Sequence, residues 1–116
     1  MQFENLEVWK RSARLCADVY KGLSELRDFG FKDQITRSAL SVPSNIAEGY
    51  ERESVKEMIN FLSYAKGSAG ELRTQIYIGM EIQYIHRNVG KQWLDEVLEI
   101  SKMLHGLIQS KRNQCE

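Results

Sequence analysis

Proline, glycine and long apolar runs are scarce in this chain of 116 residues. Proline occurs once, at Pro43, and glycine eight times. This scarcity argues against a protein built of strands and turns and favours helices. No apolar run approaches the roughly 18 residues of a membrane helix. The N-terminal segment carries neither the basic leader nor the apolar run of a signal peptide. We therefore expect neither a transmembrane segment nor secretion.

Paired cysteines and net charge are also missing. Cys16 and Cys115 lie far apart and form no Cys-x-x-Cys motif, so we expect reduced thiols in a cytoplasmic protein. The 16 basic and 16 acidic side chains cancel, which leaves no net field to attract nucleic acid or an anionic membrane from a distance. Binding to nucleic acid would need a local patch, and we expect no membrane partner.

Signatures of catalysis and metal binding do not occur in the sequence. There is no Glu-x-x-His pair, no G-x-S-x-G motif and no phosphate-binding glycine loop. His86 and His105 have no carboxylate or cysteine at ligand spacing. We predict a non-enzymatic protein without metal or cofactor. Catalysis at a patch formed by Asn45, Glu48 and Glu71 is an open alternative that would require a bound ligand or metal.

Apolar residues recur at alternating three- and four-residue spacing in four segments. This spacing places them on one face of a helix and predicts helices over about 5–27, 32–51, 54–85 and 89–110. Ser54 and Glu57 form a capping box at the start of the third segment. A chain of this length forms one domain, here 1–116. Short connections predict an all-α, antiparallel up-down-up-down four-helix bundle.

Pro43 lies inside the second segment. A proline in a helix interior costs about 3 kcal/mol because it forfeits a hydrogen bond and crowds the carbonyl four residues back. The apolar stripe nevertheless keeps its phase across Pro43, from Ile35 to Ile46, which predicts a continuous but kinked helix. Two short helices are the alternative.

Small residues gather at 65–70 in the third segment. Glycine inside a helix costs about 1 kcal/mol relative to alanine, so Gly67 and Gly70 predict a close approach by the helix over 32–51. Simple tolerance of glycine in a long helix is the alternative.

Several apolar residues extend beyond the stripes that the core needs. Contiguous exposed apolar patches are typical of interfaces, and two different apolar faces favour a head-to-tail contact that closes into a ring. Alternatively, these residues cover helix ends and loops within one subunit. The predicted oligomer interface comprises Leu40, Ala47, Tyr50, Tyr64, Ile78 and Ile82.

Two polar surfaces are also candidates for partner binding. Basic residues on the outer face of the first helix could bind phosphate, but Glu4, Glu7 and Asp18 share this region and an ordinary solvated face is the alternative. A second patch could bind a partner, or its members could satisfy one another and the backbone freed by Pro43. The basic surface comprises Lys10, Arg11, Arg14 and Lys21, and the polar patch comprises Arg37, Asn45, Glu48, Ser68 and Glu71.

Four segments carry a resemblance to a known family: "FENLEVWKRS", "QITRSALSVPSNIAEGYER", "FLSYAKGSAGELRTQI" and "EISKMLHGLIQS". Together they resemble the four-helix-bundle proteins encoded by intervening sequences of bacterial 23S rRNA genes, under the old label of 23S ribosomal-type proteins. The chain is also similar to the accessory variability determinant proteins of diversity-generating retroelements, which are basic pentamers that bind nucleic acid and a reverse transcriptase. The family motif falls on Arg37, Pro43, Asn45, Glu48, Gly49, Gly67, Ser68, Glu71 and Leu72.

This resemblance implies a bundle with a proline in its second helix and a homopentameric ring. Thr36 stands where relatives commonly carry a second basic residue, which weakens the inference of nucleic-acid binding. The expected function is an oligomeric adaptor that binds RNA, another nucleic acid or a protein. The alternative is a purely structural or protein-interaction module without affinity for nucleic acid.

Overall fold

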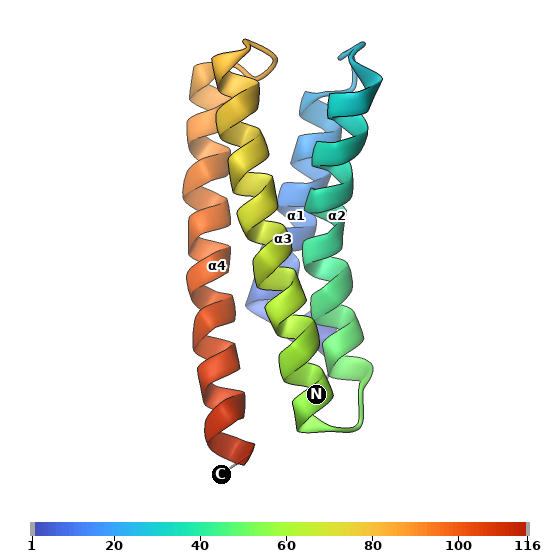
Figure 1. Cartoon of the computed structure of the whole chain (residues 1–116), viewed down its shortest axis with the longest axis vertical. Coiled ribbons are helices and arrows are strands. Elements are labelled where there is room, and N and C mark those ends of the chain that lie inside the picture. Colours follow the sequence, from blue (N-terminus) through green and yellow to red (C-terminus); the bar gives the residue numbers. More distant parts are fainter. Residues whose placement is uncertain (1, 116) are drawn as a thin grey trace.

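The chain folds into four long helices in the computed structural model, which describes residues 2–115 and, for Cys115, only the backbone. A short 3-10 helix, η1 (Phe3–Asn5), precedes them, and no strand occurs in the described part. The helices run alternately up and down along a body of 47 × 21 × 20 Å (Figure 1). The predicted all-α four-helix bundle is confirmed. The helices are α1 (Glu7–Gly22), α2 (Phe29–Glu51), α3 (Val55–Glu81) and α4 (Arg87–Cys115).

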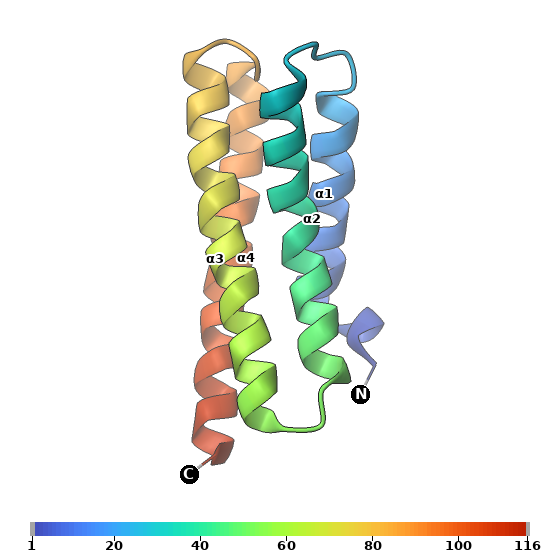
Figure 2. The same ribbon diagram turned by 45° about the vertical axis from the view of Figure 1, so that its right-hand side comes forward.

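Each helix packs against two neighbours. α2 contacts α1 and α3, whereas α4 contacts α3 and α1. α1 and α3 lie diagonally across the bundle: α1 is behind α3 in Figure 1, and in Figure 2 the two helices lie on opposite sides, with α4 behind α3. The molecule therefore has four seams, which are the lines along which neighbouring helices meet: α1/α2, α2/α3, α3/α4 and α4/α1.

The predicted apolar stripes meet in one core. Its largest fully buried side chains include Ile35 and Ile46 of α2, Leu72 and Ile76 of α3, and Leu104 of α4. Burial of such side chains supplies most of the stability of a helical bundle. Within residues 2–115, no helix is long and apolar enough to span a membrane.

α2 runs through Pro43 without interruption. This confirms a continuous helix, and the alternative of two short helices is wrong. A kink at Pro43 stays a prediction. Ala39 and Val42 are buried on the core side, and the ring of Pro43 is itself buried.

α1 is shorter than the predicted 5–27. Asn5 belongs to η1, where the Phe3 ring packs edge-on against Trp9 with centroids 5.2 Å apart. The helix ends at Gly22, yet Leu23 is only 3% exposed and Leu26 packs on the core. The apolar spacing of the sequence therefore continues past the end of the helix, because Leu23 and Leu26 in the turn after α1 also pack on the core.

α2 begins at Phe29, earlier than the predicted residue 32. Asp28 caps it, since its Oδ1 accepts a hydrogen bond from the Phe31 backbone N–H at 3.1 Å. The other carboxylate oxygen of Asp28 accepts the Tyr84 hydroxyl at 2.8 Å. This contact ties the α1–α2 turn to the α3–α4 turn. The hydrogen bond from the Phe31 N–H, together with the one from Tyr84, holds the pKa of Asp28 below its usual range.

α3 begins after Ser54, whose side chain accepts the Glu57 backbone N–H at 3.0 Å as the capping box predicts. It ends at Glu81 rather than 85, because Gln83 adopts a left-handed conformation with φ of 65°. Ile85 then folds back, donates its N–H to the Gly79 carbonyl and is only 3% exposed. α4 extends beyond the predicted residue 110.

The predicted role of Gly67 and Gly70 is wrong. A Cβ at either position would meet nothing within 4 Å, so neither glycine admits a neighbouring helix. The close approach of α2 to α3 occurs at Gly49 instead, where a Cβ would lie 3.2 Å from the Met58 carbonyl oxygen and from Cβ of Phe61.

Candidate functional site

The α2/α3 seam contains part of the predicted polar patch. Asn45 donates to the Ser41 carbonyl oxygen and to Ser41 Oγ, both at 2.9 Å. Ser41 Oγ in turn lies 2.8 Å from Ser68 Oγ of α3. The structure thus brings Asn45 and Ser68 together through Ser41, in a network whose members are half-buried.

The other members of this patch do not join the network. Arg37 pairs with Asp33 at 3.0 Å and Glu48 pairs with Arg52 at 2.9 Å, each within α2. Glu71 is exposed on α3. Apart from Glu71, the polar groups of this patch therefore bond to close neighbours on α2 or link α2 to α3.

The α4/α1 seam holds Arg11 of the predicted basic surface. Its guanidinium donates to both carboxylate oxygens of Glu96, at 2.9 and 2.6 Å. This bidentate pair lowers the pKa of Glu96 and raises that of Arg11. Lys10, Arg14 and Lys21 remain exposed on α1. Arg11 is thus neutralised by a residue on a helix distant in sequence, and three cations of the predicted surface are left.

The α1/α2 seam is open and apolar. Leu40, at the middle of α2, is 49% exposed, and Ala47 beside it is half-buried. Burial raises the pKa of the Cys16 thiol at the base of this seam, which makes it a poor nucleophile. The hollow has a volume of about 340 Å³. We call it the apolar groove, lined by Phe3, Trp9, Ala13, Cys16, Leu40, Pro43, Ser44 and Ala47.

The outer side of α3 carries a second apolar surface. Tyr64 and Ile78 of α3, and Ile82 directly after its last residue, are 56, 48 and 46% exposed, and their spacing places them on one face. We call these three residues the α3 face. Tyr50, the remaining member of the predicted interface, is half-buried against the core, and Lys111 lies over its ring.

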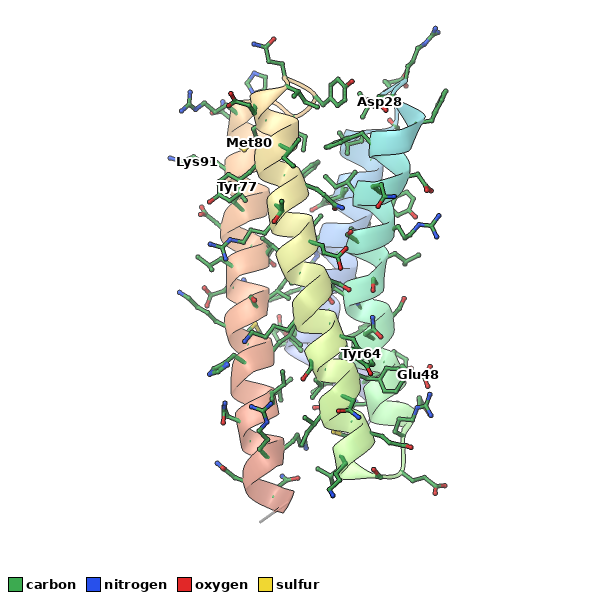
Figure 3. The ribbon with its side chains drawn as sticks, viewed as in Figure 1. Asp28, Glu48, Tyr64, Tyr77, Met80 and Lys91 are labelled. Carbon is green, nitrogen blue, oxygen red and sulfur yellow. The ribbon has the colours of Figure 1, made fainter. Side chains whose placement is uncertain are left out.

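The α3/α4 seam is open and cationic, which sequence reasoning missed. One hollow here has cationic and aromatic side chains at its edges and apolar side chains on its floor. It is lined by Arg73, Tyr77 and Met80 of α3 and by Arg87, Lys91, Leu94, Asp95 and Leu98 of α4. Figure 3 shows Tyr77 and Lys91 gathered at the end of the bundle where α3 turns into α4. A second hollow along the same seam is lined by residues that include Lys66, His105 and Arg112. We call the two hollows together the cationic groove.

A signal for this groove exists in the sequence. Lys66, Arg73 and Tyr77 recur at seven and four residues, which places them on one stripe of a helix. Sequence spacing alone does not reveal that this stripe adjoins the one on α4 that carries Lys91.

Among residues 2–115, no group of three or more His, Cys, Asp or Glu side chains is placed to hold a metal ion. In the alternative catalytic patch, Asn45 bonds to Ser41, Glu48 pairs with Arg52 and Glu71 is exposed. The candidate functional surfaces are therefore the apolar groove, the α3 face and the cationic groove.

Residues 4–106 match the family of 23S rRNA-intervening sequence proteins. The chain belongs to this family. The match covers all four helices except the C-terminal part of α4. Neither the family description nor the solved structure described next names a reaction.

A solved structure with the same fold comes from Bacteroides thetaiotaomicron and is described as a protein with unknown function from the S23 ribosomal protein family. It is 28% identical, with a TM-score of 0.82, over 87% of this chain and 97% of that one. No curated protein matches the chain. Family membership thus fixes the fold and leaves the function to be argued from the surfaces.

Proposed function

We propose that this member of the intervening sequence protein family is a non-catalytic adaptor that works as a homo-oligomer, assembled head to tail into a closed ring. The observation that carries the proposal is the pair of exposed apolar surfaces, the apolar groove and the α3 face. Large apolar side chains that share an exposed surface are typical of interfaces. Five copies are the expected number, because the family resemblance implies a pentamer.

The two surfaces suit a head-to-tail contact. α1 and α3 are diagonal in the bundle, so the groove beside α1 and the outer face of α3 point to different sides. When two copies join through unlike surfaces, the pair still has one free apolar groove and one free α3 face. Further copies therefore add until the ring closes. Side chains such as Ile78 and Leu40 would bury their exposed halves in this contact, at about 25 cal/mol per Å² of apolar area.

Pro43 has a role in this proposal. Its buried ring lines the apolar groove, and proline presents no N–H that would need a partner there. The free Cys16 thiol at the base of the groove fits the reducing cytoplasm, which is the proposed location. The alternative, an interaction module without affinity for nucleic acid, shares this assembly and differs only in its partner.

The mass of the particle in solution tests the proposal. Light scattering on the eluting chain should give a small multiple of 13.5 kDa. Leu40→Glu and Ile78→Glu each place a charge on one of the two surfaces, so each should elute as a monomer with unchanged helix content. Phe29→Glu is the matched control, because Phe29 is 70% exposed at the start of α2 and lies on neither surface. It should leave the mass unchanged.

Mixing the two variants distinguishes a head-to-tail contact from a symmetric one. Leu40→Glu retains the α3 face and Ile78→Glu retains the apolar groove, so the mixture should form a dimer that cannot grow. A mixture that stays monomeric contradicts the head-to-tail arrangement. A wild-type chain that stays monomeric at high concentration overturns the proposed function itself.

A further inference from the structure

The cationic groove concentrates positive charge on a protein that has no net charge. Its two hollows are lined by five lysines and arginines and by one carboxylate, Asp95. Glu81 lies at one end, in the adjoining hollow that Arg87 also lines. The chain as a whole carries equal numbers of acidic and basic groups, so this seam is a local excess of cations.

Three of these cations, Arg73, Arg87 and Lys91, are available to a partner, whereas the half-buried Lys66 places its Nζ 3.4 Å from His105 Nδ1 across the seam. In the part of the chain that the structure describes, the ion pairs are Arg11 with Glu96, Arg37 with Asp33 and Arg52 with Glu48. None of them uses Arg73, Arg87 or Lys91, and all three of these side chains are exposed. Even Asp95, one helical turn from Lys91, is not within ion-pair distance of it.

The groove is long. At a rise of about 1.5 Å per residue, Lys91 and Arg112 are about 32 Å apart along α4. Lys66 and Arg73 flank the same seam on α3. A linear polyanion can follow such a row of charges, whereas a small anion would engage only one end.

An exposed aromatic ring lies among the cations. Tyr77 is 55% exposed and lines the hollow together with Arg73 and Lys91. Basic grooves with exposed aromatic rings are typical of proteins that bind single strands, because the cations follow the phosphates and the rings stack on unpaired bases. A membrane or an acidic peptide would make no comparable use of a stacking ring.

Gly70 leaves the helix backbone accessible between Lys66 and Arg73. A Cβ at this position would meet nothing within 4 Å, so no contact within the subunit requires glycine. Glycine destabilises a helix interior by about 1 kcal/mol relative to alanine. Close approach of a ligand to the backbone is one use of such a residue.

We propose that the cationic groove binds single-stranded nucleic acid, with phosphates on Arg73 and Lys91 and a base stacked on Tyr77. This inference rests on the adaptor function proposed above and names its partner. It also assigns phosphate binding to the α3/α4 seam rather than to the basic surface predicted on α1, where Glu96 neutralises Arg11.

Fluorescence anisotropy with labelled oligouridylate tests the inference at low and at raised salt. Binding should weaken steeply as salt rises, because each phosphate contact releases counterions. The double variant Arg73→Gln/Lys91→Gln should lower the slope of log K against log salt by about 1.4, which is about 0.7 for each lost contact. Tyr77→Leu should weaken binding about 5- to 140-fold and leave the slope unchanged, because it removes stacking but no charge.

The matched control is Lys10→Gln/Arg14→Gln, which removes two exposed charges from α1. It should bind like the wild type. Loss of binding in this control with unchanged binding in the groove variants would overturn the inference, and so would absence of binding at low salt. Oligodeoxyuridylate of equal length separates RNA from DNA as the source of the strand, and tighter binding of a duplex would contradict a single-stranded partner.

The particle mass is measured in the same samples. An intact oligomer that does not bind oligouridylate refutes this inference and leaves the proposed assembly standing. A monomer that binds through Arg73 and Lys91 refutes the assembly and leaves the groove standing.

Discussion

The two open seams of this bundle differ in chemistry although the same pairing of antiparallel helices forms both. At α1/α2, Leu40 and Ala47 border a hollow with an apolar lining. At α3/α4, Arg73 and Lys91 border a hollow in which Tyr77, Met80, Leu94 and Leu98 lie among three cations and one carboxylate. The helix pairs supply the shape of each seam, and the side chains at its edges decide whether an apolar surface or a polyanion fits.

At the other two seams, polar side chains pair across the contact between the helices, and we call these seams closed. Arg11 and Glu96 close α4/α1 with a bidentate ion pair. Ser41 and Ser68 join α2 to α3 with a hydrogen bond, and further along this seam Gly49 lets the two helices approach at Met58 and Phe61. Polar residues at closed seams serve the fold, whereas exposed residues at open seams are free to bind partners.

The largest expected effect comes from the core that both open seams share. Leu72 is 1% exposed and faces an internal space lined by residues from all four helices. Leu72→Ala should lower the free energy of unfolding by about 2–5 kcal/mol, because it leaves a cavity. Urea denaturation measures this loss.

Leu98→Ala is the control for this prediction. Leu98 lies at the edge of the cationic groove and is 37% exposed, so its truncation should cost about 1 kcal/mol or less. Equal losses in the two variants would show that the seams do not depend on a common core.

A smaller effect is expected at Pro43, and it should separate folding from assembly. Pro43→Ala restores a helical N–H and relieves a clash, worth about 3 kcal/mol. It also removes two buried methylenes, at about 0.8 kcal/mol each. The subunit should therefore gain about 1 kcal/mol of stability in urea denaturation, while self-association weakens because the apolar groove loses part of its lining.

Ser44→Ala is the neighbouring control, since Ser44 lines the same groove but is exposed. This substitution should change neither the stability of the subunit nor its self-association appreciably. A Pro43→Ala variant that assembles as tightly as the wild type would remove the proposed reason for tolerating proline in α2.

The smallest effect is expected at the closed α4/α1 seam and depends on pH. The hydrogen bond from Arg11 lowers the pKa of Glu96, so the ion pair stabilises the fold above the ordinary glutamate pKa of about 4.3. This contribution is lost as the pH falls through the lower pKa of the folded state. Glu96→Gln should therefore cost about 1 kcal/mol or less at neutral pH, and the difference from wild type should vanish in acid.

Thermal unfolding from neutral to acidic pH measures this difference. Glu99→Gln is the control, because Glu99 is exposed nearby and forms no ion pair among the described residues. A cost at Glu96 that persists unchanged in acid would contradict the assignment to the ion pair. Nucleic-acid binding should be unaffected, since this seam is separate from the cationic groove.

Sequence patterns predicted the number of helices, their order and the passage of α2 through Pro43. They failed at helix ends, because Leu23 and Ile85 continue the apolar spacing from turns rather than from helices. Among candidate site residues, exposure of Leu40 and Tyr64 was foreseen from their helical phase. The pairing of Arg11 was not, because its partner Glu96 is 85 residues away in sequence.

By itself, the sequence determined the four helices and the face of each that is buried, because apolar spacing and the Ser54 cap act over a few neighbouring residues. Only the tertiary structure decided which helices adjoin, and so which charges meet a partner and which stay exposed. Arg11 and Arg73 look alike as cations on polar faces of helices. One meets Glu96 across a closed seam and the other lines an open one, since packing distributes the charges that the sequence only supplies.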